Sequence, residues 1–600
     1  MIQRSISHTL LLISCFVFVL LQSCKTDPKS DAGASVSDEP LTVVSHLNAE
    51  PDMLNPIIST SGYTRSVTNH IFQNLVHYDT KTLELAPMLA KAIPQSEVIE
   101  AGEYKGKIRR TYEIHDEAIW TDGKPVTGHD VAFSLKAVMN PKVPAPQYRS
   151  FSNEYKDIII DEANPKKFSI ISTDYFLGDY VFTDIPVFPS HIFDPKGLME
   201  KYTVKQLSDA KTAAELAASD EQLQEFATQF TSEEFMRDKK YVQGSGAYEL
   251  VEWRPGQQII LKKKENWWGD QLADEYNLLT ARAEEIIFRP IIDPTTAVTE
   301  LKGEGVDVMN MIAPQQYEAL KNSEQGKKLL NFYEPDVLQI YYIGINTNNP
   351  KLSDKRVRRA LAHLVDQERI ISNIMSGYGR PIVSPIHPSR SYYNDDLPAI
   401  EYSPEKAITL LKEAGWEDTN GNGVVDKVID GELTELRIDY LASRGGRGGM
   451  IGKLIAEGAK LAGVDLRLDE KDLNLVRQKM SSRDYEMTTG AWGQDPSLYD
   501  PYQNWHTDND VPSGGNKFGF GNDASDTVIE KIRSRVTPEE RTQLYKDLQQ
   551  IIYDEQPCIF LLAPKGRMAV NKKFDYEPSI RKPNIFENEF KWSNNKIVSD

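Results

Sequence analysis

Residues Tyr112–Pro141, YEIHDEAIWTDGKPVTGHDVAFSLKAVMNP, carry the clearest local signals in the chain. The alternation at the start of this stretch predicts a half-buried strand, and Trp120–Pro125 then forms a compact turn. Thr127 is a typical helix N-cap, and Asp130 stands three residues later, where it can complete a capping box. The helix should end before Pro141, because proline cannot continue it. The stretch therefore predicts a strand, a tight turn and a capped helix, in that order.

The same stretch resembles the signature of extracellular solute-binding protein family 5, the peptide- and nickel-binding proteins of ABC importers. The family pattern reads Leu-Arg-x-Gly-Val-x-Trp-x-Asp-Gly-x-Pro-Val-Thr-Ala-x-Asp-Val, and Gly128 stands here where the pattern has alanine. We interpret the motif as structural, since it builds a turn and a helix start rather than a ligand site. The matching residues are Trp120, Asp122, Gly123, Pro125, Val126, Thr127, Asp130 and Val131.

Further segments resemble the family in the family's own order, so that the resemblance covers nearly all of residues 41–570. They comprise a glycine-rich segment, two strand-like segments, a strand-helix-strand unit and a strand followed by a capped helix. In sequence these are Gly244–Tyr248, Trp253–Gly256, Asn266–Gly269, Ile286–Met311, and Tyr342–Asn346 with Asp354–Ala360.

The resemblance implies an α/β protein with a two-lobe, periplasmic-binding-protein-like fold. One lobe would be discontinuous and carry an inserted subdomain, and two crossing segments would form the hinge. We expect the discontinuous lobe to comprise residues 41–60, 186–315 and 558–600, the inserted subdomain residues 61–185, and the second lobe residues 316–557.

Composition argues for a globular, exported protein. The 600 residues carry a formal net charge of −19, which speaks against nucleic acid as a partner and against a surface that adheres to anionic lipid. Cys558 would be the one cysteine left as a thiol, so no disulfide framework is expected. It lies in an apolar, strand-like run and should be buried and inert.

The amino terminus has the composition of a signal peptide over residues 1–23. Leu10–Leu21 is an apolar run too short to span a bilayer comfortably, and Arg4 precedes it. Leu21–Cys24 resembles the bacterial lipobox, which implies that Cys24 is lipidated and becomes the first residue of the mature protein. Residues 24–40 would then form a flexible tether. The alternative is an ordinary cleaved signal peptide.

Residues 196–240 are polar, acidic and helix-favouring. We expect a solvated helical hairpin on one lobe, and the alternative is a surface on which a partner docks.

A possible calcium loop lies within Gly415–Lys427, GWEDTNGNGVVDK. Asp418, Asn420, Asn422 and Asp426 occupy positions 1, 3, 5 and 9 of an EF-hand-type loop. Position 12 is isoleucine rather than glutamate, and no helix should follow. A structural Ca²⁺ is therefore weighed against a hairpin turn built from Asx and glycine residues. No other cofactor is expected.

Ala491–His506, AWGQDPSLYDPYQNWH, is an acidic, aromatic stretch that should form a rigid, irregular loop lining a cleft. Family peptide binders have a similar Trp-x-x-Asp-x-x-Asp/Glu-Pro pattern, in which the first Asp holds the ligand's amino group. This implies Asp495 as the ammonium anchor with Trp492 beside it, and Asp500 in the turn that shapes the site. Tyr499 completes the expected ligand-binding set. The alternative is that both aspartates merely cap turns.

Ser443–Met450, SRGGRGGM, precedes a helix-like run. Free N–H groups at a helix start attract anions, so Arg444 or Arg447 could bind a ligand carboxylate; the alternative is an exposed flexible loop.

The sequence contains none of the common hydrolase, phosphate-binding or redox motifs, so we predict that the protein is not an enzyme. The resemblance implies a lipid-anchored receptor of the cell envelope, facing the periplasm or the cell exterior. It would capture oligopeptides between two lobes and deliver them to the permease subunits of an ABC importer. We expect a monomer whose membrane contact is through the lipid anchor only. Other solutes of the family remain alternatives, namely nickel chelates and oligosaccharides, as do two other classes of protein, an exported hydrolase and a surface adhesin.

Overall fold

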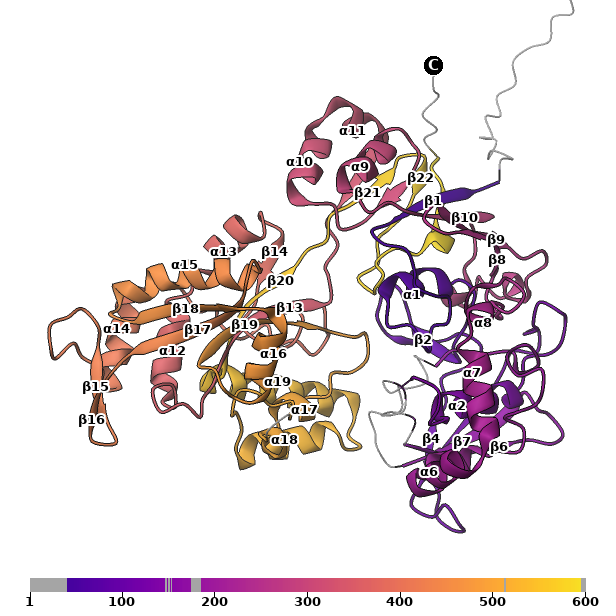
Figure 1. Cartoon of the computed structure of the whole chain (residues 1–600), viewed down its shortest axis with the longest axis horizontal. Coiled ribbons are helices and arrows are strands. Elements are labelled where there is room, and N and C mark those ends of the chain that lie inside the picture. The colour runs from indigo at the N-terminus through magenta and orange to yellow at the C-terminus, as the bar shows by residue number, and fades with distance from the viewer. Residues whose placement is uncertain are drawn as a thin grey trace, which may run out of the picture. The chain divides into compact units, whose positions relative to one another are not determined.

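The structure is a computed structural model, and it describes residues 40–145, 148, 152, 154–173, 185–511 and 514–594 (Figure 1). The predicted signal peptide, Cys24 and most of the predicted tether lie outside the described residues. Residues 40–600 group into one unit. Within the described part, no helix combines the length and apolar character needed to cross a bilayer.

The first large sheet has seven strands in the order β12-β21-β11-β1-β10-β9-β8. β1 pairs in parallel with β10 and β11, so the carboxyl ends of these three strands meet at one edge. Val43 and Ile286 are fully buried and lie in the larger apolar core. The strands are β1 (Thr42–Leu47), β8 (Tyr248–Arg254), β9 (Gln258–Lys263), β10 (Glu285–Pro290), β11 (Val308–Met309), β12 (Leu330–Tyr333) and β21 (Met568–Asn571).

The second large sheet has six strands in the order β14-β20-β13-β19-β17-β18. β17 is parallel to both β18 and β19, whereas β13 is antiparallel to β19 and β20. Cys558 in β20 is a buried free thiol whose pKa is raised by burial, which confirms the predicted burial of this cysteine. The strands are β13 (Gln339–Ile345), β14 (Gly379–Pro381), β17 (Arg437–Ser443), β18 (Asp465–Lys471), β19 (Met487–Gly493) and β20 (Cys558–Pro564).

The chain crosses between these sheets at residues 334–338, from β12 to β13, and at residues 565–567, from β20 to β21 (Figure 1). Sheet membership therefore changes after Tyr333 and after Pro564. The lobe boundaries expected from sequence, at 315/316 and 557/558, place β12 and β20 with the wrong sheet. Pairing between strands that are distant in sequence decides which sheet each of them joins.

A third, antiparallel sheet has the order β4-β5-β7-β6. The helix α2 (Gly128–Met139) lies between β5 and β6 in sequence, with Thr127 as its N-cap. Thr127 N donates to Asp130 Oδ2 at 3.0 Å, and the capping box is closed in both directions. The predicted turn and capped helix are thus confirmed. The strands are β4 (Ser96–Val98), β5 (Ile108–Glu113), β6 (Tyr155–Ile160) and β7 (Lys167–Ser172).

The helical hairpin expected within residues 196–240 is wrong. This segment forms four short helices, because Asp209, Asp220 and Ser232 each cap a new helix start. Its apolar side is buried rather than solvated, with Phe226 and Phe230 stacked at 5.2 Å between ring centroids. The helices are α5 (Val204–Ser208), α6 (Ala210–Ser219), α7 (Glu221–Phe230) and α8 (Glu233–Arg237).

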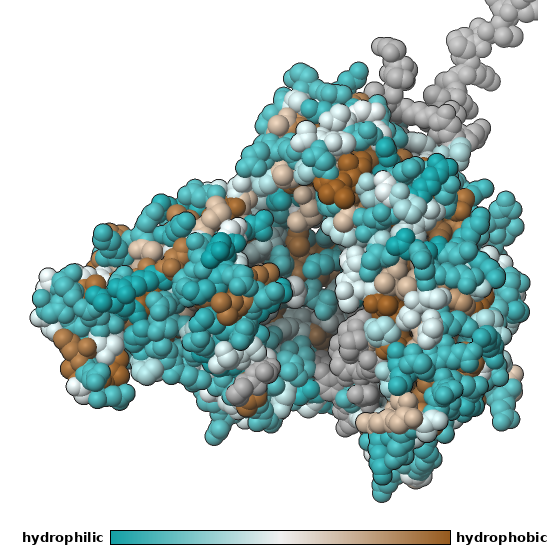
Figure 2. All heavy atoms as spheres, in the orientation of Figure 1, coloured by the Kyte–Doolittle hydropathy of each residue, from teal (hydrophilic) through white to brown (hydrophobic). Residues whose placement is uncertain are grey.

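The remaining helices flank the sheets, and Figure 2 shows a largely hydrophilic outer face with scattered apolar side chains. The helices are α1 (Gly62–Thr68), α4 (Ser190–Phe193), α9 (Pro294–Lys302), α10 (Pro314–Asn322), α11 (Glu324–Leu329), α12 (Lys355–His363), α13 (Gln367–Ile374), α14 (Pro404–Glu413), α15 (Arg447–Leu461), α16 (Leu473–Ser481), α17 (Tyr502–Trp505), α18 (Asp523–Ile532) and α19 (Pro538–Glu555). The remaining strands are β2 (Val76–Tyr78), β3 (Leu85–Pro87), β15 (Asp426–Ile429), β16 (Glu432–Glu435), β22 (Phe574–Asp575) and β23 (Lys591–Trp592).

Candidate functional site

The candidate site lies at the carboxyl edge of the six-stranded sheet. β17 ends at Ser443 and the parallel strand β19 ends at Gly493, so the loops that follow them leave the sheet at the same edge. Gln339, the first residue of β13, pairs with Gly493 there. In open α/β sheets, ligands bind outside the carboxyl ends of the strands. The two stretches selected from sequence, residues 443–450 and 491–506, therefore meet at the edge where a ligand is expected.

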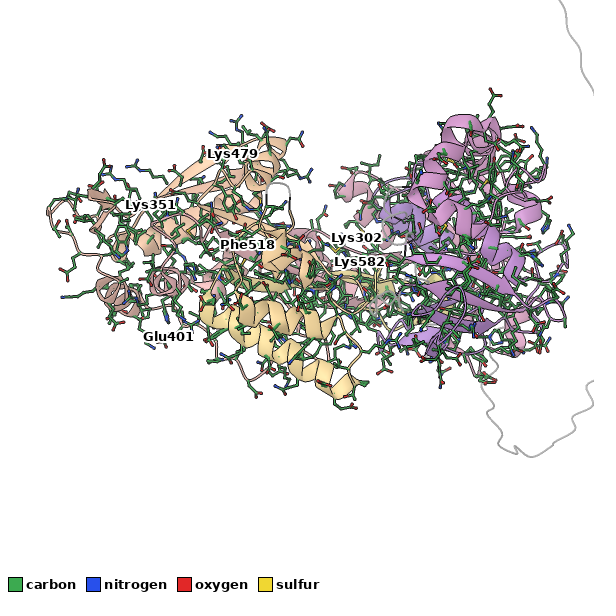
Figure 3. The ribbon with its side chains drawn as sticks, turned by 90° about the horizontal axis from the view of Figure 1, so that it is seen from below. Lys302, Lys351, Glu401, Lys479, Phe518 and Lys582 are labelled. Atoms are coloured by element: carbon green, nitrogen blue, oxygen red, sulfur yellow. The ribbon has the colours of Figure 1, made fainter. Side chains whose placement is uncertain are left out.

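The stretch 491–506 is more regular than the loop expected from its Asp-Pro pairs. Its first three residues complete β19, and Tyr502–Trp505 forms the short helix α17. The half-buried indole of Trp492 stacks on Tyr342 with 4.0 Å between ring centroids. It also meets Phe518 edge-on at 5.7 Å between ring centroids; Phe518 is labelled in Figure 3. These rings form a rigid aromatic wall beside the end of β19.

Asp495 is exposed, and its carboxylate has no hydrogen bond or ion pair with any described residue. The backbone around it is nevertheless fixed. Arg390 donates to the carbonyl oxygen of Asp495 and, at 2.7 Å, to that of Pro496. The side chain of Gln494 donates to Pro385 O at 2.7 Å and accepts from His387 N at 3.1 Å. The site thus presents an unpaired carboxylate on a backbone that is held in place.

Asp500 and Tyr499 point into the protein instead. Asp500 Oδ1 accepts from Tyr502 N at 3.0 Å, at the start of α17, and lies 3.4 Å from Arg533 Nε. The Tyr499 hydroxyl accepts from Trp505 Nε1 at 2.8 Å, and burial raises its pKa. The structure therefore separates these two residues from Asp495, because their polar groups are engaged in shaping α17.

Arg444 and Arg447 lie at the start of α15. Arg447 is the first residue of the helix, and its Nη1 donates to the Tyr341 hydroxyl at 3.0 Å. Arg444 is exposed, and its backbone N donates to Lys471 O at 2.8 Å, whereas its side chain has no hydrogen bond to a described residue. Neither arginine forms an ion pair with a described residue. Gly446 caps α15 without a side-chain hydrogen bond, which adds free N–H groups to the two cations.

Sequence reasoning missed Arg390 and His387, which fix the loop from another segment. His387 is buried, and burial lowers its pKa to about 4, against the opposing charge of Asp336. Nothing in the local sequence around these residues distinguishes them from ordinary loop residues. Their role depends on contacts across a long stretch of chain.

The possible calcium loop is closed by its own hydrogen bonds. Asp418 accepts from the N–H groups of Gly421, Asn422 and Gly423 at 2.8–3.1 Å. The buried Asp426 accepts from the backbone N–H of Thr419 at 3.1 Å and from Asn420 Nδ2 at 3.1 Å. Among the described residues, no group of three or more His, Cys, Asp or Glu could hold a metal ion. The arrangement is the Asx-rich turn that the sequence left open as the alternative.

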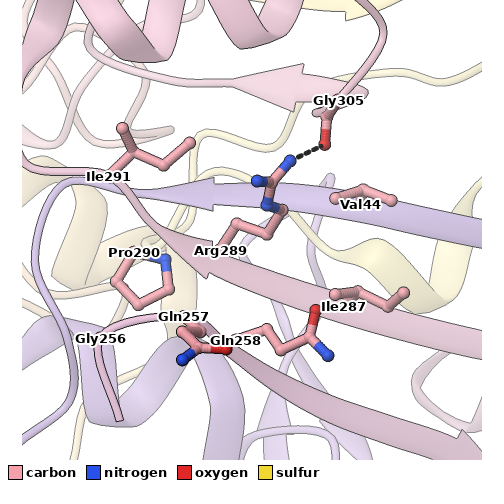
Figure 4. A pocket seen from close by; sticks show the side chains of 9 residues that line it. All are labelled: Val44, Gly256, Gln257, Gln258, Ile287, Arg289, Pro290, Ile291 and Gly305. Atoms are coloured by element: carbon pink, nitrogen blue, oxygen red, sulfur yellow. Dashed lines mark hydrogen bonds between the residues drawn. The ribbon is translucent and has the colours of Figure 1, made fainter. Parts of the chain in front are cut away.

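A surface pocket of about 540 Å³ lies on the seven-stranded sheet (Figure 4). Its one cationic side chain, Arg289, donates to Gly305 O and to Glu300 Oε2, both at 2.7 Å. The charge of Arg289 is therefore already paired, and the residues that line this pocket include no unpaired charged side chain comparable to Asp495.

A family model, "Bacterial extracellular solute-binding proteins, family 5 Middle", matches residues 87–513 of this chain. Among curated proteins, the oligopeptide-binding protein AppA of Bacillus subtilis (strain 168) is 24% identical over 563 residues, covering 92% of this chain and 91% of that protein.

Solved structures share the fold. AppA from Bacillus subtilis in complex with a nonapeptide aligns with a TM-score of 0.61 at 21% identity, over 92% of this chain and all of that one. NikZ from Campylobacter jejuni in complex with Ni(L-His) aligns with a TM-score of 0.61 at 20% identity, over 92% of this chain and 99% of that one. The predicted periplasmic-binding-protein-like α/β fold is therefore confirmed.

Proposed function

Because this chain belongs to family 5 of the bacterial extracellular solute-binding proteins, we propose that it captures peptides outside the cytoplasm and delivers them to an ABC importer. The family consists of solute-binding proteins and not enzymes, which agrees with the absence of enzyme motifs in the sequence. The exported hydrolase and the adhesin are thus set aside.

The unpaired carboxylate of Asp495 is the observation that carries the peptide proposal. A peptide's ammonium group needs an acceptor beside a wall that excludes water, and Asp495 follows Trp492 and its aromatic neighbours on a fixed backbone. Arg447 and Arg444 would bind the carboxylate of the same ligand. The name of AppA and its complex with a nonapeptide support a peptide as the first choice.

The capture mechanism would be hinge closure. The chain crosses between the two large sheets at residues 334–338 and 565–567, and changes of backbone torsion at these segments would let one sheet rotate against the other. A peptide that contacts both sides stabilises the closed state. If the peptide backbone is held like an added strand, main-chain hydrogen bonds give affinity without reading the sequence. Water in unused pocket volume would then permit varied side chains.

A nickel chelate is the second candidate, favoured by the likeness to NikZ and its Ni(L-His) ligand. Arg444 and Arg447 would then bind the carboxylates of the chelate, while Asp495 would bind the amino group of an amino-acid ligand. An oligosaccharide is the third candidate solute. A neutral sugar carries no negative charge that could pair with Arg444 and Arg447.

The proposal includes a lipid anchor at Cys24 and a tether that places the binding protein beside the permease subunits. Membrane contact would be through the lipid only. Replacing Cys24 by serine should release the protein from the membrane fraction without changing its ligand affinity.

The experiment that tests the proposed function is mass spectrometry of whatever co-purifies with the native protein. A mixture of peptides supports peptide capture. A single metal chelate or sugar would contradict it and select one of the other candidates.

A further inference from the structure

The backbone of Tyr378 belongs to the six-stranded sheet. This residue stands directly before β14, which is an edge strand of that sheet, and it is 5% exposed. Its carbonyl accepts from Lys565 N at 3.3 Å, which extends the pairing of β14 with β20 into the second crossing segment. A movement of the six-stranded sheet would therefore carry Tyr378 with it.

The side chain of Tyr378 packs against elements of the other sheet. Its ring lies in an apolar cluster with Tyr317 and Leu320 of α10, Leu330 of β12 and Ala569 of β21. Tyr317 meets the ring edge-on, with 5.7 Å between the ring centroids. β12 and β21 are strands of the seven-stranded sheet, and α10 lies between β11 and β12 in sequence. Tyr378 thus joins the backbone of one sheet to the core of the other.

The hydroxyl of Tyr378 forms a hydrogen bond across the same boundary. It donates to the carboxylate of Glu318 on α10. Burial and this hydrogen bond raise the pKa of Tyr378, so the hydroxyl keeps its proton and remains the donor. The Glu318 carboxylate also lies 3.4 Å from Asn322 Nδ2, one turn further along α10. The acceptor is therefore oriented by its own helix.

Arg567 brings the hinge into the same contact. Its guanidinium carbon lies 5.1 Å from the ring centroid of Tyr378. Its Nε donates to Ile312 O at 2.6 Å, and its carbonyl accepts from Ile312 N at 3.1 Å. Ile312 stands just before α10, so these two hydrogen bonds fix the end of the second crossing segment to the seven-stranded sheet's side. Tyr378 therefore contacts the crossing segment where that segment reaches the seven-stranded sheet.

The two kinds of contact made by Tyr378 should respond differently to a rotation between the sheets. Apolar packing is non-directional, so the ring can slide on Tyr317. A hydrogen bond weakens steeply when its angle or length changes, so the bond to Glu318 belongs to one arrangement. In the arrangement described, Asp495 at one carboxyl edge is exposed, and Ile292, two residues beyond β10 at the other, is 78% exposed. The bond thus accompanies exposed sheet edges.

We propose that Tyr378 is a positioning residue of the hinge. Its hydrogen bond to Glu318 holds the sheets in the arrangement with exposed carboxyl edges, and its ring is the pivot on which they close. This inference rests on the proposed function, since it places a restraint on the hinge closure proposed there. Without the hydrogen bond the closed arrangement is more populated, and the apparent affinity for the ligand rises with that population.

Tyr378→Phe keeps the ring and removes the hydroxyl. It should lower about tenfold the concentration of a pentapeptide library with free termini that half-saturates the protein, because a hydrogen bond to a charged group no longer opposes closure. Retained peptides are quantified by mass spectrometry after gel filtration. Glu318→Ala removes the acceptor from an exposed helix position and should have the same effect, which preserves the test if Tyr378→Phe fails to fold. The double variant should match either single variant.

Tyr317→Phe is the matched control. The Tyr317 hydroxyl donates to Tyr333 O at 3.2 Å, and both residues belong to the seven-stranded sheet's side. This variant removes the same group from the same cluster, so it should lower the melting temperature and leave the half-saturating concentration unchanged. Unchanged or weaker peptide binding in Tyr378→Phe and Glu318→Ala overturns the proposal. An equal gain of affinity in Tyr317→Phe also overturns it, since the effect would then be a general loosening of the cluster.

A second readout needs no peptide. Small-angle X-ray scattering of the ligand-free proteins should give a smaller radius of gyration for Tyr378→Phe and Glu318→Ala than for wild type and Tyr317→Phe. If wild type retains no peptide, peptide capture is wrong, and the scattering result decides the restraint alone. Equal radii in all four proteins overturn the restraint.

Discussion

The carboxylate of Asp495 should contribute to binding rather than to stability, because no described residue pairs with it. Asp495→Asn is expected to weaken peptide binding about a hundredfold or more, since a desolvated ammonium loses its charged acceptor. The melting temperature should barely change. Titration calorimetry with a peptide identified in the co-purified mixture measures the first quantity, and calorimetric melting the second.

Asp500→Asn is the matched control for Asp495→Asn. It weakens the ion pair with Arg533 and the contact that starts α17, so it should lower the melting temperature and affect affinity less. Unchanged affinity in Asp495→Asn would contradict the assignment of the ammonium anchor.

His387 should make the fold less stable in mild acid. Burial is the main cause that lowers its pKa to about 4 in the folded state, whereas in the unfolded chain it titrates near 6.5. The unfolded state therefore binds more protons between these values, and stability is lost as the pH falls from about 6.5 to about 4. The loss attributable to His387 is on the order of 2–3 kcal/mol.

Replacing His387 by glutamine should flatten this pH dependence. Urea unfolding at pH 7 and pH 4.5 measures the difference, with His363→Gln as the control because that ring is partly exposed. An equal loss of stability in wild type and His387→Gln would contradict the role assigned to burial.

At the scale of single elements, the cap of α2 is a local device that sequence alone predicts. Thr127→Ala removes the acceptor for the helix start and half of the box with Asp130, so it should cost about 1 kcal/mol. Thr121→Ala makes the same threonine-to-alanine change in the exposed turn and should leave the free energy of unfolding unaltered. Urea unfolding compares the two, and equal midpoints would show that the cap contributes nothing.

Elements specified by neighbouring residues were predicted well, including the capped α2 and the strand that holds Cys558. Errors arose where the contacts are distant in sequence. The apolar face of α7 packs into the larger core. The sequence of α7 shows this face but not the residues that cover it, so a solvated hairpin was expected. β12 lies in the seven-stranded sheet and β20 in the six-stranded sheet, each the reverse of what was expected. Their partner strands are distant in sequence, so the local pattern does not reveal them.

In the candidate site, too, features set by neighbouring residues could be predicted, whereas features set by distant contacts could not. Asp495 could be selected because its acidic, aromatic setting is visible in the sequence. The inward direction of Asp500 and Tyr499 could not, because it depends on Arg533 and Trp505.

For the whole molecule, the proposed hinge at the two crossing segments would couple ligand binding to closure in one equilibrium. In this proposal, a ligand held by Asp495 and Arg447 at the carboxyl edge of one sheet would contact the other sheet only after closure. Peptide at a hundred times its Kd should stabilise the wild-type fold by about 2.7 kcal/mol. Small-angle X-ray scattering should show a smaller radius of gyration on saturation. At the same peptide concentration, Asp495→Asn should keep the ligand-free radius and gain little stability. A saturated wild type whose radius stays constant would mean that the site is complete without closure, and the crossing segments would then be connectors rather than a hinge.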